Sequence, residues 1–262
     1  MKQFTPPHLD CSIFDECRTA FITGGNRGIG KAIAKSLAED GINLIISCRS
    51  LSTENREFFD NLKRFGIKIG VINIDLENPE SIKEGMKKIN ELKTIPDILI
   101  NNAGQASFSS FMFTRLDDVK RIFQVNYFAP LQITQNLIKK ILRKPYGRVI
   151  NIGSVAGIDG SEGNSAYGAS KAALMLWTRS LAKELSKTNI TVNAIAPGII
   201  STQMSDSIKD NMKTAMVESQ ALMRSGSAEE VANVVKFLCK KSSQGITGQI
   251  LRVDGGTEGW CK

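Results

Sequence analysis

The 262-residue sequence predicts a single α/β domain, in which helices cover both faces of a doubly wound parallel sheet of about seven strands. Short apolar runs alternate along the chain with longer segments of helical periodicity, and this alternation is typical of βα units. The apolar runs are too uniformly hydrophobic for strands that expose one face, so the sheet is expected to be covered on both sides. No Ser- or Pro-rich linker and no internal repeat divides the chain.

Seven apolar runs, bounded by Gly, Asn or Pro, are expected to form the strands: residues 19–23, 43–47, 67–73, 97–101, 148–152, 191–195 and 249–253. Helical periodicity places the helices near residues 28–40, 52–65, 79–93, 115–143, 165–187 and 227–240. Right-handed crossovers between successive parallel strands then build a doubly wound sheet.

The domain is expected to span residues 19–262, after an N-terminal extension formed by residues 1–18. Residues 199–222 differ from the rest of the domain because they are rich in Ser, Met and Lys and have weak strand character. Since this segment lies between the end of a predicted strand and a predicted helix, it is interpreted as a substrate lid.

Composition excludes several classes of protein. With 42% hydrophobic and 23% charged residues, the chain is neither a disordered protein nor a disulfide-stapled scaffold. His8 is the only histidine and lies in a Pro-containing N-terminal stretch, which argues against a Ser-His-Asp hydrolase and against a His-rich zinc site. We therefore expect no metal, and in an enzyme of this sequence another residue must transfer protons.

The net charge of +8 suits an anionic partner such as a nucleotide, phosphopantetheine, an acidic protein or a nucleic acid, although a solvated basic surface explains most of the lysines. No recognition motif supports nucleic-acid binding.

The five scattered cysteines contain no CxxC motif and indicate free thiols in a reducing compartment. Without a signal-peptide pattern or an apolar run near the ~20 residues of a membrane span, we expect a cytoplasmic protein that does not enter a membrane.

Gly24, Gly28 and Gly30 lie between the first predicted strand and the first predicted helix. Glycine at such positions allows a tight turn and close approach of a phosphate, and the helix N-terminus offers free N–H groups to a pyrophosphate. The spacing is GxxxGxG, and a glycine-rich turn without a ligand would have the same composition. The position directly after the first strand favours a dinucleotide site.

Arg49 follows the second predicted strand, where an NAD site usually has an acidic residue. Arg27 lies within the glycine loop and provides a second guanidinium. Each of them alone is explained as a surface arginine, but together they suit a ribose 2′-phosphate and favour NADP(H) over NAD.

Tyr167 and Lys171 are four residues apart and share one face of a predicted helix, and Ser154 follows a predicted strand at its carboxyl end. A tyrosine of pKa ~10 is a weak base at neutral pH, but a nearby lysine cation and a nicotinamidium are expected to lower that pKa. Tyr167 can then exchange a proton with a carbonyl or alcohol oxygen that Ser154 holds. The YxxxK spacing alone is common on amphipathic helices and gains meaning only within the whole set.

In order and spacing, these motifs resemble the short-chain dehydrogenase/reductase family over nearly all of residues 19–257, and the closest likeness is to 3-oxoacyl-acyl-carrier-protein reductases. The matching motifs are Thr23–Gly30, Asn101–Gly104, Asn126, Ser154, Tyr167, Lys171, Pro197–Gly198 with Thr202, and Val253–Gly256. The resemblance implies a Rossmann-like fold. It also implies that Tyr167 is the acid–base residue, that Lys171 is its pKa partner and a ligand of the nicotinamide ribose, and that Ser154 orients the carbonyl. Asn126 resembles the residue that bends its helix and holds a water in a proton relay.

The same resemblance implies the residues that contact NADP(H), with a structural role tying strands together as the alternative for Asn102. They are Gly24, Asn26, Arg27, Gly28, Ile29, Gly30, Arg49, Asp75, Leu76, Asn102, Ala103, Gly104, Tyr167, Lys171, Pro197, Gly198, Ile200 and Thr202.

The implied function is NADPH-dependent reduction of a ketone to a secondary alcohol, with a 3-oxoacyl thioester, free or bound to a carrier protein in fatty acid biosynthesis, as the leading substrate. Other small carbonyls or alcohols (sugars, steroids, acetoacetyl-CoA, secondary metabolites) and a nucleotide-binding scaffold without turnover remain open.

The resemblance also implies a homotetramer, in which residues 115–143 and 165–187 pair across one interface and the C-terminal strands across another. Apolar stripes on these helices are expected to face partly the protein's own sheet and partly a neighbour: Ile133, Leu137 and Ile141, and Leu174, Trp177 and Leu181.

Overall fold

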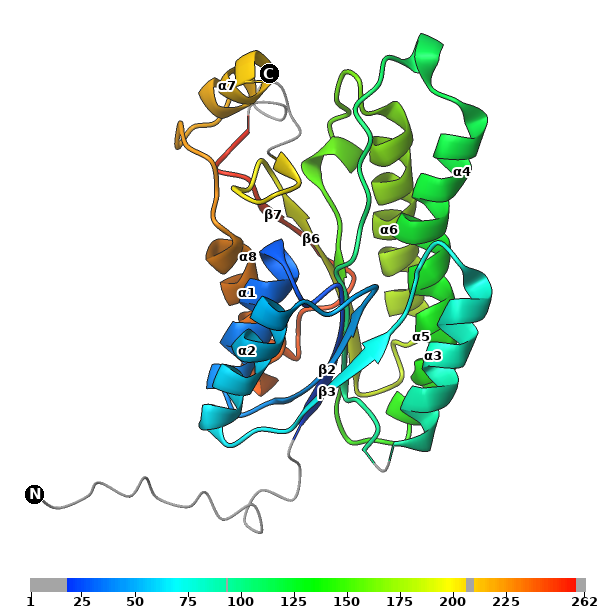
Figure 1. Cartoon of the computed structure of the whole chain (residues 1–262). Helices are drawn as coiled ribbons and strands as arrows, with labels where there is room; N and C mark the ends of the chain where they lie inside the picture. The colour runs from blue at the N-terminus through cyan, green and yellow to red at the C-terminus, as the bar shows by residue number, and fades with distance from the viewer. Residues whose placement is uncertain (1–17, 93, 206–209, 258–262) are drawn as a thin grey trace, which may run out of the picture.

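The computed structural model describes residues 18–92, 94–205 and 210–257, which form one parallel sheet with helices on both faces (Figure 1). The strands lie in the order β3-β2-β1-β4-β5-β6-β7, so the predicted doubly wound sheet is confirmed. Their bounds are β1 Thr19–Thr23, β2 Asn43–Cys48, β3 Ile69–Asn73, β4 Ile98–Asn101, β5 Gly147–Ile152, β6 Ile190–Pro197 and β7 Ile250–Val253.

Two hydrophobic cores cover the two faces of the sheet. The helices are α1 Gly28–Glu39, α2 Thr53–Leu62, α3 Pro79–Glu91, α4 Leu116–Phe123, α5 Ala129–Ile141, α6 Ser165–Glu184, α7 Asp210–Glu218 and α8 Ala228–Leu238. Helices α1, α2 and α8 pack on one face, and α3 to α6 on the other (Figure 1). Neighbouring residues of one strand enter opposite cores, as Phe21 and Ile22 of β1 do, because side chains alternate along a strand.

The expectation that every strand is covered on both sides is wrong for β3. Gly70, Val71 and Asn73 of this strand are exposed, and all of β7 is half-buried. Both strands are edges of the sheet, where helices cover less of the surface. The apolar sequence of β3 gives no sign of its place at the edge.

The helix predicted over residues 115–143 is continuous but not uniform. Helices α4 and α5 are joined by a π-helical segment, Gln124–Phe128, which contains Asn126. The predicted helix over residues 52–65 also changes type, because α2 is followed by a 3₁₀ turn, Lys63–Phe65, that ends at Gly66 with φ 75°.

The strand order reverses between β1 and β4, and ligands of such sheets bind at this point. The side-chain amide of Asn102 donates to the carbonyls of Thr23 (2.9 Å) and Gly24 (3.1 Å). The Thr23 hydroxyl in turn accepts from the backbone N–H of Asn102 and of Ala103, each at 3.0 Å. Asn102 therefore ties β1 to β4, which confirms the structural alternative considered for it.

The lid predicted over residues 199–222 contains α7, which stands above the carboxyl ends of the strands (Figure 1). Its first residues, Ile199 and Ile200, are buried and belong to the body of the domain. Residues 206–209 and almost all of the predicted extension, residues 1–17, lie outside the described residues. Within the described part of the chain, no helix is long and apolar enough to cross a membrane.

Candidate active site

The glycine loop between β1 and α1 has the backbone that the sequence predicts. Gly24 and Gly28 have φ of +65° and +50°, a region that L-residues rarely adopt. A Cβ on Gly30 would lie 2.2 Å from the Gly24 carbonyl oxygen, so only glycine lets the helix come this close to the loop. No side chain caps the N-terminus of α1, where Arg27 is the N-cap residue. The first amides of α1 are therefore left for an anion.

Tyr167 and Lys171 lie in α6. The other predicted cofactor residues lie at or after the carboxyl ends of five strands: β1 (Gly24, Asn26, Arg27, Gly28, Ile29, Gly30), β2 (Arg49), β3 (Asp75, Leu76), β4 (Asn102, Ala103, Gly104) and β6 (Pro197, Gly198, Ile200, Thr202). A Cβ on Gly28 would lie 3.5 Å from the Thr202 methyl group, so the loops after β1 and β6 face each other. The side chains of Leu76 and Ile200 are buried in the two cores, and the Leu76 carbonyl accepts from Gln124 Nε2 at 3.2 Å.

Both candidate ligands of a 2′-phosphate are exposed. Arg27 is exposed at the start of α1, and the Arg49 side chain is 62% exposed with its Nη1 3.6 Å from Oε1 of Glu77. Asp75 supports the same region differently, since its carboxylate accepts from the Glu77 N–H at 3.1 Å and its own N–H donates to Ser81 Oγ at 2.9 Å. The Asp75 carboxylate thus shapes the turn after β3.

The structure brings Ser154 and Tyr167 together. Ser154 follows β5 and precedes a 3₁₀ turn, Val155–Gly157, that packs on α6. A Cβ on Gly157 would lie 2.6 Å from the backbone N of Ala172, so glycine allows this close contact. This places the Ser154 hydroxyl close enough to the Tyr167 phenol to favour a lower pKa of that phenol.

Lys171 is 3% exposed, and its Nζ donates to the Ile152 carbonyl at 2.7 Å. The ammonium lies 5.9 Å from the centroid of the Tyr167 ring. Burial disfavours the charged form and lowers the pKa of Lys171 from 10.5 to about 8.

The expected lowering of the Tyr167 pKa is not found among the chain's own groups. Burial of the phenol raises the pKa of Tyr167, and the hydrogen bond from Ser154 opposes this only in part. Lys171 does not reverse the direction: its ammonium lies over the Tyr167 ring at 5.9 Å from the centroid, and it donates to the Ile152 carbonyl. Tyr167 is thus a protonated donor at neutral pH.

Asn126 is fully buried in the π segment. Its Oδ1 accepts from the N–H of Gln105 at 2.8 Å, and its Nδ2 donates to the Gln105 carbonyl and to Ser170 Oγ, both at 2.9 Å. The predicted helix distortion at Asn126 is confirmed, and the water-mediated relay stays a prediction. A Cβ on Gly104 would lie 3.2 Å from Lys171 Nζ and 3.4 Å from Asn126 Oδ1, so the three residues adjoin.

Comparison with known proteins agrees with this geometry. Residues 24–258 match the family model described as enoyl-(acyl carrier protein) reductase. The 3-oxoacyl-[acyl-carrier-protein] reductases of Aquifex aeolicus and Buchnera aphidicola are 38% and 36% identical to the chain, over 91% and 92% of its length and 96% and 97% of theirs. The chain belongs to the short-chain dehydrogenase/reductase family.

Two solved dehydrogenases share the fold of this family member. Acetoin dehydrogenase from Salmonella typhimurium matches with a TM-score of 0.81 and 33% identity, over 92% of this chain and 95% of that one. A 4-hydroxyisoleucine dehydrogenase mutant complexed with NADH and succinate gives a TM-score of 0.83 and 30% identity, over 92% and 98%. This short-chain dehydrogenase/reductase is an oxidoreductase, of a family that uses nicotinamide cofactors.

The residues present fit such a cofactor. The glycine loop and the uncapped start of α1 form a cradle for a pyrophosphate, and a side chain at Gly30 would obstruct it. Lys171, which shares α6 with Tyr167, adjoins Gly104 after β4, and the nicotinamide ribose would be held there. When bound, the nicotinamide supplies or accepts a hydride.

Several residues that shape the site of this family member are not evident from the sequence. Gln105 holds Asn126 through its backbone, and Ser170 links Asn126 to α6 by donating to the Tyr167 carbonyl at 2.7 Å. Arg252 forms ion pairs with Asp159 and Asp254 beside the Ser154 turn. Only Ser170, inside the YxxxK segment, could have been noticed from its position.

Burial of Lys171 predicts an unusual pH dependence of stability. The folded chain releases this proton near pH 8 and the unfolded chain near pH 10.5, so the unfolded chain binds more protons between these values and stability rises with pH. From pH 8 to 9.5 we expect the contribution of Lys171 to the free energy of unfolding to rise by about 1.5 kcal/mol. Urea unfolding of the wild type and Lys171→Met measures this difference. Exposed Lys35→Met keeps the wild-type slope, and equal slopes for the wild type and Lys171→Met would contradict the buried-cation assignment.

Proposed function

We propose that this protein is an NADPH-dependent reductase that converts a 3-oxoacyl thioester to the 3-hydroxyacyl product. The reaction type is supported by the neighbouring hydroxyls of Ser154 and Tyr167, which lie beside the buried ammonium of Lys171. The names of the relatives from Aquifex aeolicus and Buchnera aphidicola support the substrate class. Those names also support a carrier protein as the group that bears the acyl chain, although a free thioester offers the same carbonyl.

The chemistry follows from the states of the three side chains. The hydroxyls of Ser154 and Tyr167 would bind the substrate oxygen, and a bound nicotinamide would supply the hydride that the carbonyl carbon accepts. Tyr167 gives its proton to the oxygen, and its raised pKa ensures that this proton is present at neutral pH. The Lys171 ammonium, protonated below about pH 8, then stabilises the phenolate.

Arg27 and Arg49 support NADPH over NADH. Both guanidiniums lie beside the loops that would hold the adenosine ribose, and Arg matches a phosphate with paired donors. Glu77 lies near Arg49 and supports its position without burying it. The free, buried thiols of Cys48 and Cys239 support the reducing, cytoplasmic location that the cysteine pattern predicts.

A second candidate is a dehydrogenase or reductase of small hydroxy compounds. The names of the two solved relatives, acetoin dehydrogenase and 4-hydroxyisoleucine dehydrogenase, favour this candidate. NADPH and NADH oxidation with acetoacetyl thioesters, acetoin and a crotonyl thioester separates the candidates. The crotonyl thioester tests reduction of a C=C bond, the reaction of an enoyl reductase, after which the matching family model is described. Faster turnover of acetoin or crotonyl thioester than of acetoacetyl thioester would displace the proposal.

The proposed assembly is a homotetramer with D₂ symmetry. The predicted stripes give it little support, because Ile133, Leu137 and Ile141 are fully buried against the protein's own sheet and Leu174 and Leu181 are buried too. Other apolar side chains of α5, α6 and their junctions support it instead, since they are exposed: Phe128 (51%), Leu142 (43%) and Leu176 (66%). Trp260, at the second predicted interface, lies outside the described residues.

Tyr167→Phe is expected to lower kcat for ketone reduction by ~10²–10⁴-fold, because only the proton donor is removed. Binding of NADPH, followed by fluorescence titration, stays at the wild-type level. Tyr127→Phe, which removes a hydroxyl outside the site, serves as the matched control and keeps its activity. A Tyr167→Phe variant as active as this control would end the assignment.

Arg49→Asp places a carboxylate where the 2′-phosphate is proposed to bind. We expect it to cost about 1.5–3 kcal/mol, or roughly ten- to a hundredfold in kcat/KM for NADPH, with little effect on NADH. Arg64→Asp makes the same charge change in the 3₁₀ turn after α2 and leaves the ratio of the two cofactors unchanged. If the ratio also stays constant in Arg49→Asp, Arg49 does not select the cofactor.

Light scattering coupled to size exclusion tests the assembly, with about four times the 28.7 kDa chain mass expected. Leu176→Glu puts a charge on the exposed face of α6 and should reduce the mass. Leu92→Glu, at the end of α3 and 42% exposed, is the matched control that keeps it. A monomeric wild type rules the tetramer out, and a stable dimer leaves only one of the two interfaces.

A further inference from the structure

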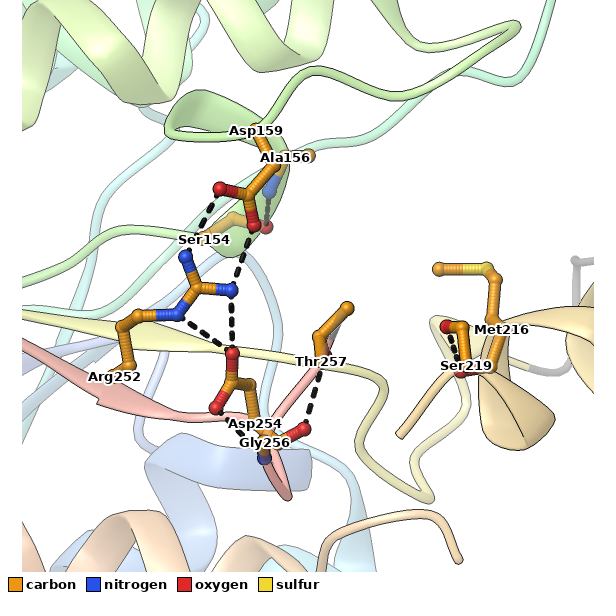
Figure 2. Close-up of polar contacts among 9 residues, drawn as sticks. All are labelled: Ser154, Ala156, Asp159, Met216, Ser219, Arg252, Asp254, Gly256 and Thr257. Carbon is orange, nitrogen blue, oxygen red and sulfur yellow. Dashed lines mark hydrogen bonds and ion pairs between the residues drawn. The ribbon is translucent and has the colours of Figure 1, made fainter. Parts of the chain in front are cut away.

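Arg252, in β7, binds the carboxylate of Asp254, two residues further along the chain, and that of Asp159, which is distant in the sequence (Figure 2). Its Nη1 and Nη2 donate to the two oxygens of Asp159 at 3.0 and 2.7 Å. Its Nε donates to Oδ2 of Asp254 at 2.7 Å, and Nη2 also lies 2.6 Å from that oxygen. All three nitrogens of the guanidinium thus bind the two carboxylates, a geometry that an ammonium cannot provide.

This cluster differs from the ion pairs on the helix surfaces of the protein. The side chains of Arg252, Asp159 and Asp254 are 21%, 23% and 6% exposed, whereas both partners of the Lys83–Glu80 pair are 74% exposed. The hydrogen bonds to Asp159 and then to Asp254 raise the pKa of Arg252 above its usual value. Partial burial reduces solvent screening, so the cluster restrains the backbone that bears it.

On one side, Asp159 is rigidly connected to Ser154. The N–H groups of Ile158 and Asp159 donate to the Val155 carbonyl at 2.8 and 2.9 Å, and the Ala156 N–H donates to Ser154 Oγ at 3.2 Å. Asp159 therefore ends the same turn that Ser154 begins. Helix α6 holds one side of this turn, through the contact at Gly157, and Arg252 holds its far end.

On the other side, Asp254 is connected to the C-terminal part of the lid. Asp254 accepts from the Gly256 N–H at 3.2 Å through its side chain, and from the Thr257 hydroxyl at 3.0 Å through its carbonyl. The carbonyls of the two glycines in this turn accept from the N–H groups of Leu222 and Ala221, each at 3.0 Å. Ser219, at the end of α7, lies across from this turn in Figure 2.

We propose that Arg252 is a positioning residue, which couples the lid to the turn that orients Ser154. The proposal rests on the proposed function, since it assigns the residue a task in the same reduction. Without the guanidinium, the carboxylates of Asp159 and Asp254 face each other unpaired, and their repulsion moves the Ser154 turn and the base of the lid apart. Displacing the Ser154 hydroxyl in this way lowers the rate of reduction, even though Ser154 itself is unchanged.

Arg252→Gln tests the proposal in the full-length protein. We expect kcat/KM for acetoacetyl thioester to fall by about 10²-fold, while the Kd for NADPH, measured by fluorescence titration, stays the same. Lys236→Gln is the matched control, because Lys236 forms a 2.6 Å ion pair with Asp40 at similar exposure (24% and 27%) far from Ser154. Wild-type kinetics per NADPH-binding site in Arg252→Gln would overturn the proposal.

Two further variants separate positioning from general stability. Asp159→Asn combined with Arg252→Gln removes the repulsion and should recover part of the lost kcat/KM, whereas a merely structural role predicts a larger loss than in the single variant. Arg252→Lys keeps the positive charge that neutralises the carboxylates but lacks the paired hydrogen bonds. Its kcat/KM should therefore lie between those of the wild type and Arg252→Gln. If Arg252→Gln does not fold, Arg252→Lys and the double variant decide, and wild-type kinetics in both overturn the proposal.

Failure of the inference and failure of the proposed function are distinguishable. If the wild type reduces acetoacetyl thioester and Arg252→Gln does so equally well, only the inference fails. If the wild type reduces no ketone, the proposed function fails, and amide hydrogen exchange of the NADPH-bound protein decides on the coupling. The coupling requires faster exchange in Arg252→Gln both in residues 155–159 and in residues 220–222. Faster exchange in neither or only one of these segments refutes it.

Discussion

The hydrogen bonds between Asn102 and the end of β1 are the constraint on which the rest of the site depends. The strand order reverses between β1 and β4, so the loops that follow them run to opposite sides and open a crevice. Asn102 crosses this point and satisfies the carbonyls of Thr23 and Gly24, which would otherwise face the crevice unpaired. With this junction held, Gly30 can approach the loop closely, and the start of α1 points at the place where a dinucleotide binds.

The sequence alone predicts most of this fold because its signals are local. Each central strand is a short apolar run, and the glycine loop, Ser154 and the Tyr167–Lys171 pair are recognisable within a few residues of a strand or helix end. The failures concern contacts between distant segments. The apolar composition of β3 does not reveal that this strand lies at an edge, and the stripe at Ile133, Leu137 and Ile141 does not reveal which partner it faces.

Electrostatic properties were predictable only in part. From sequence, a lysine four residues from a tyrosine suggests a lowered phenol pKa, but the sequence does not show how deeply either group is buried. In the structure burial dominates for both, raising the pKa of Tyr167 and lowering that of Lys171. The ion pair between Arg252 and Asp159 could not be predicted from the sequence either, because 93 residues separate them and only the packing of β7 beside β6 brings them together.

The π segment between α4 and α5 sets the rotational phase of two helical stretches that serve different purposes. Within the segment the chain must direct Asn126 toward Gln105, and on the C-terminal side of the segment it must direct Ile133 and Leu137 into the core. Each residue of a regular α-helix advances the side-chain direction by about 100°. The widened turn of the π segment allows Asn126 and the apolar stripe to take their separate directions within one continuous helix. Deleting a single residue here would leave either the polar group or the apolar stripe misdirected, so insertions and deletions are far less tolerable at this point than substitutions.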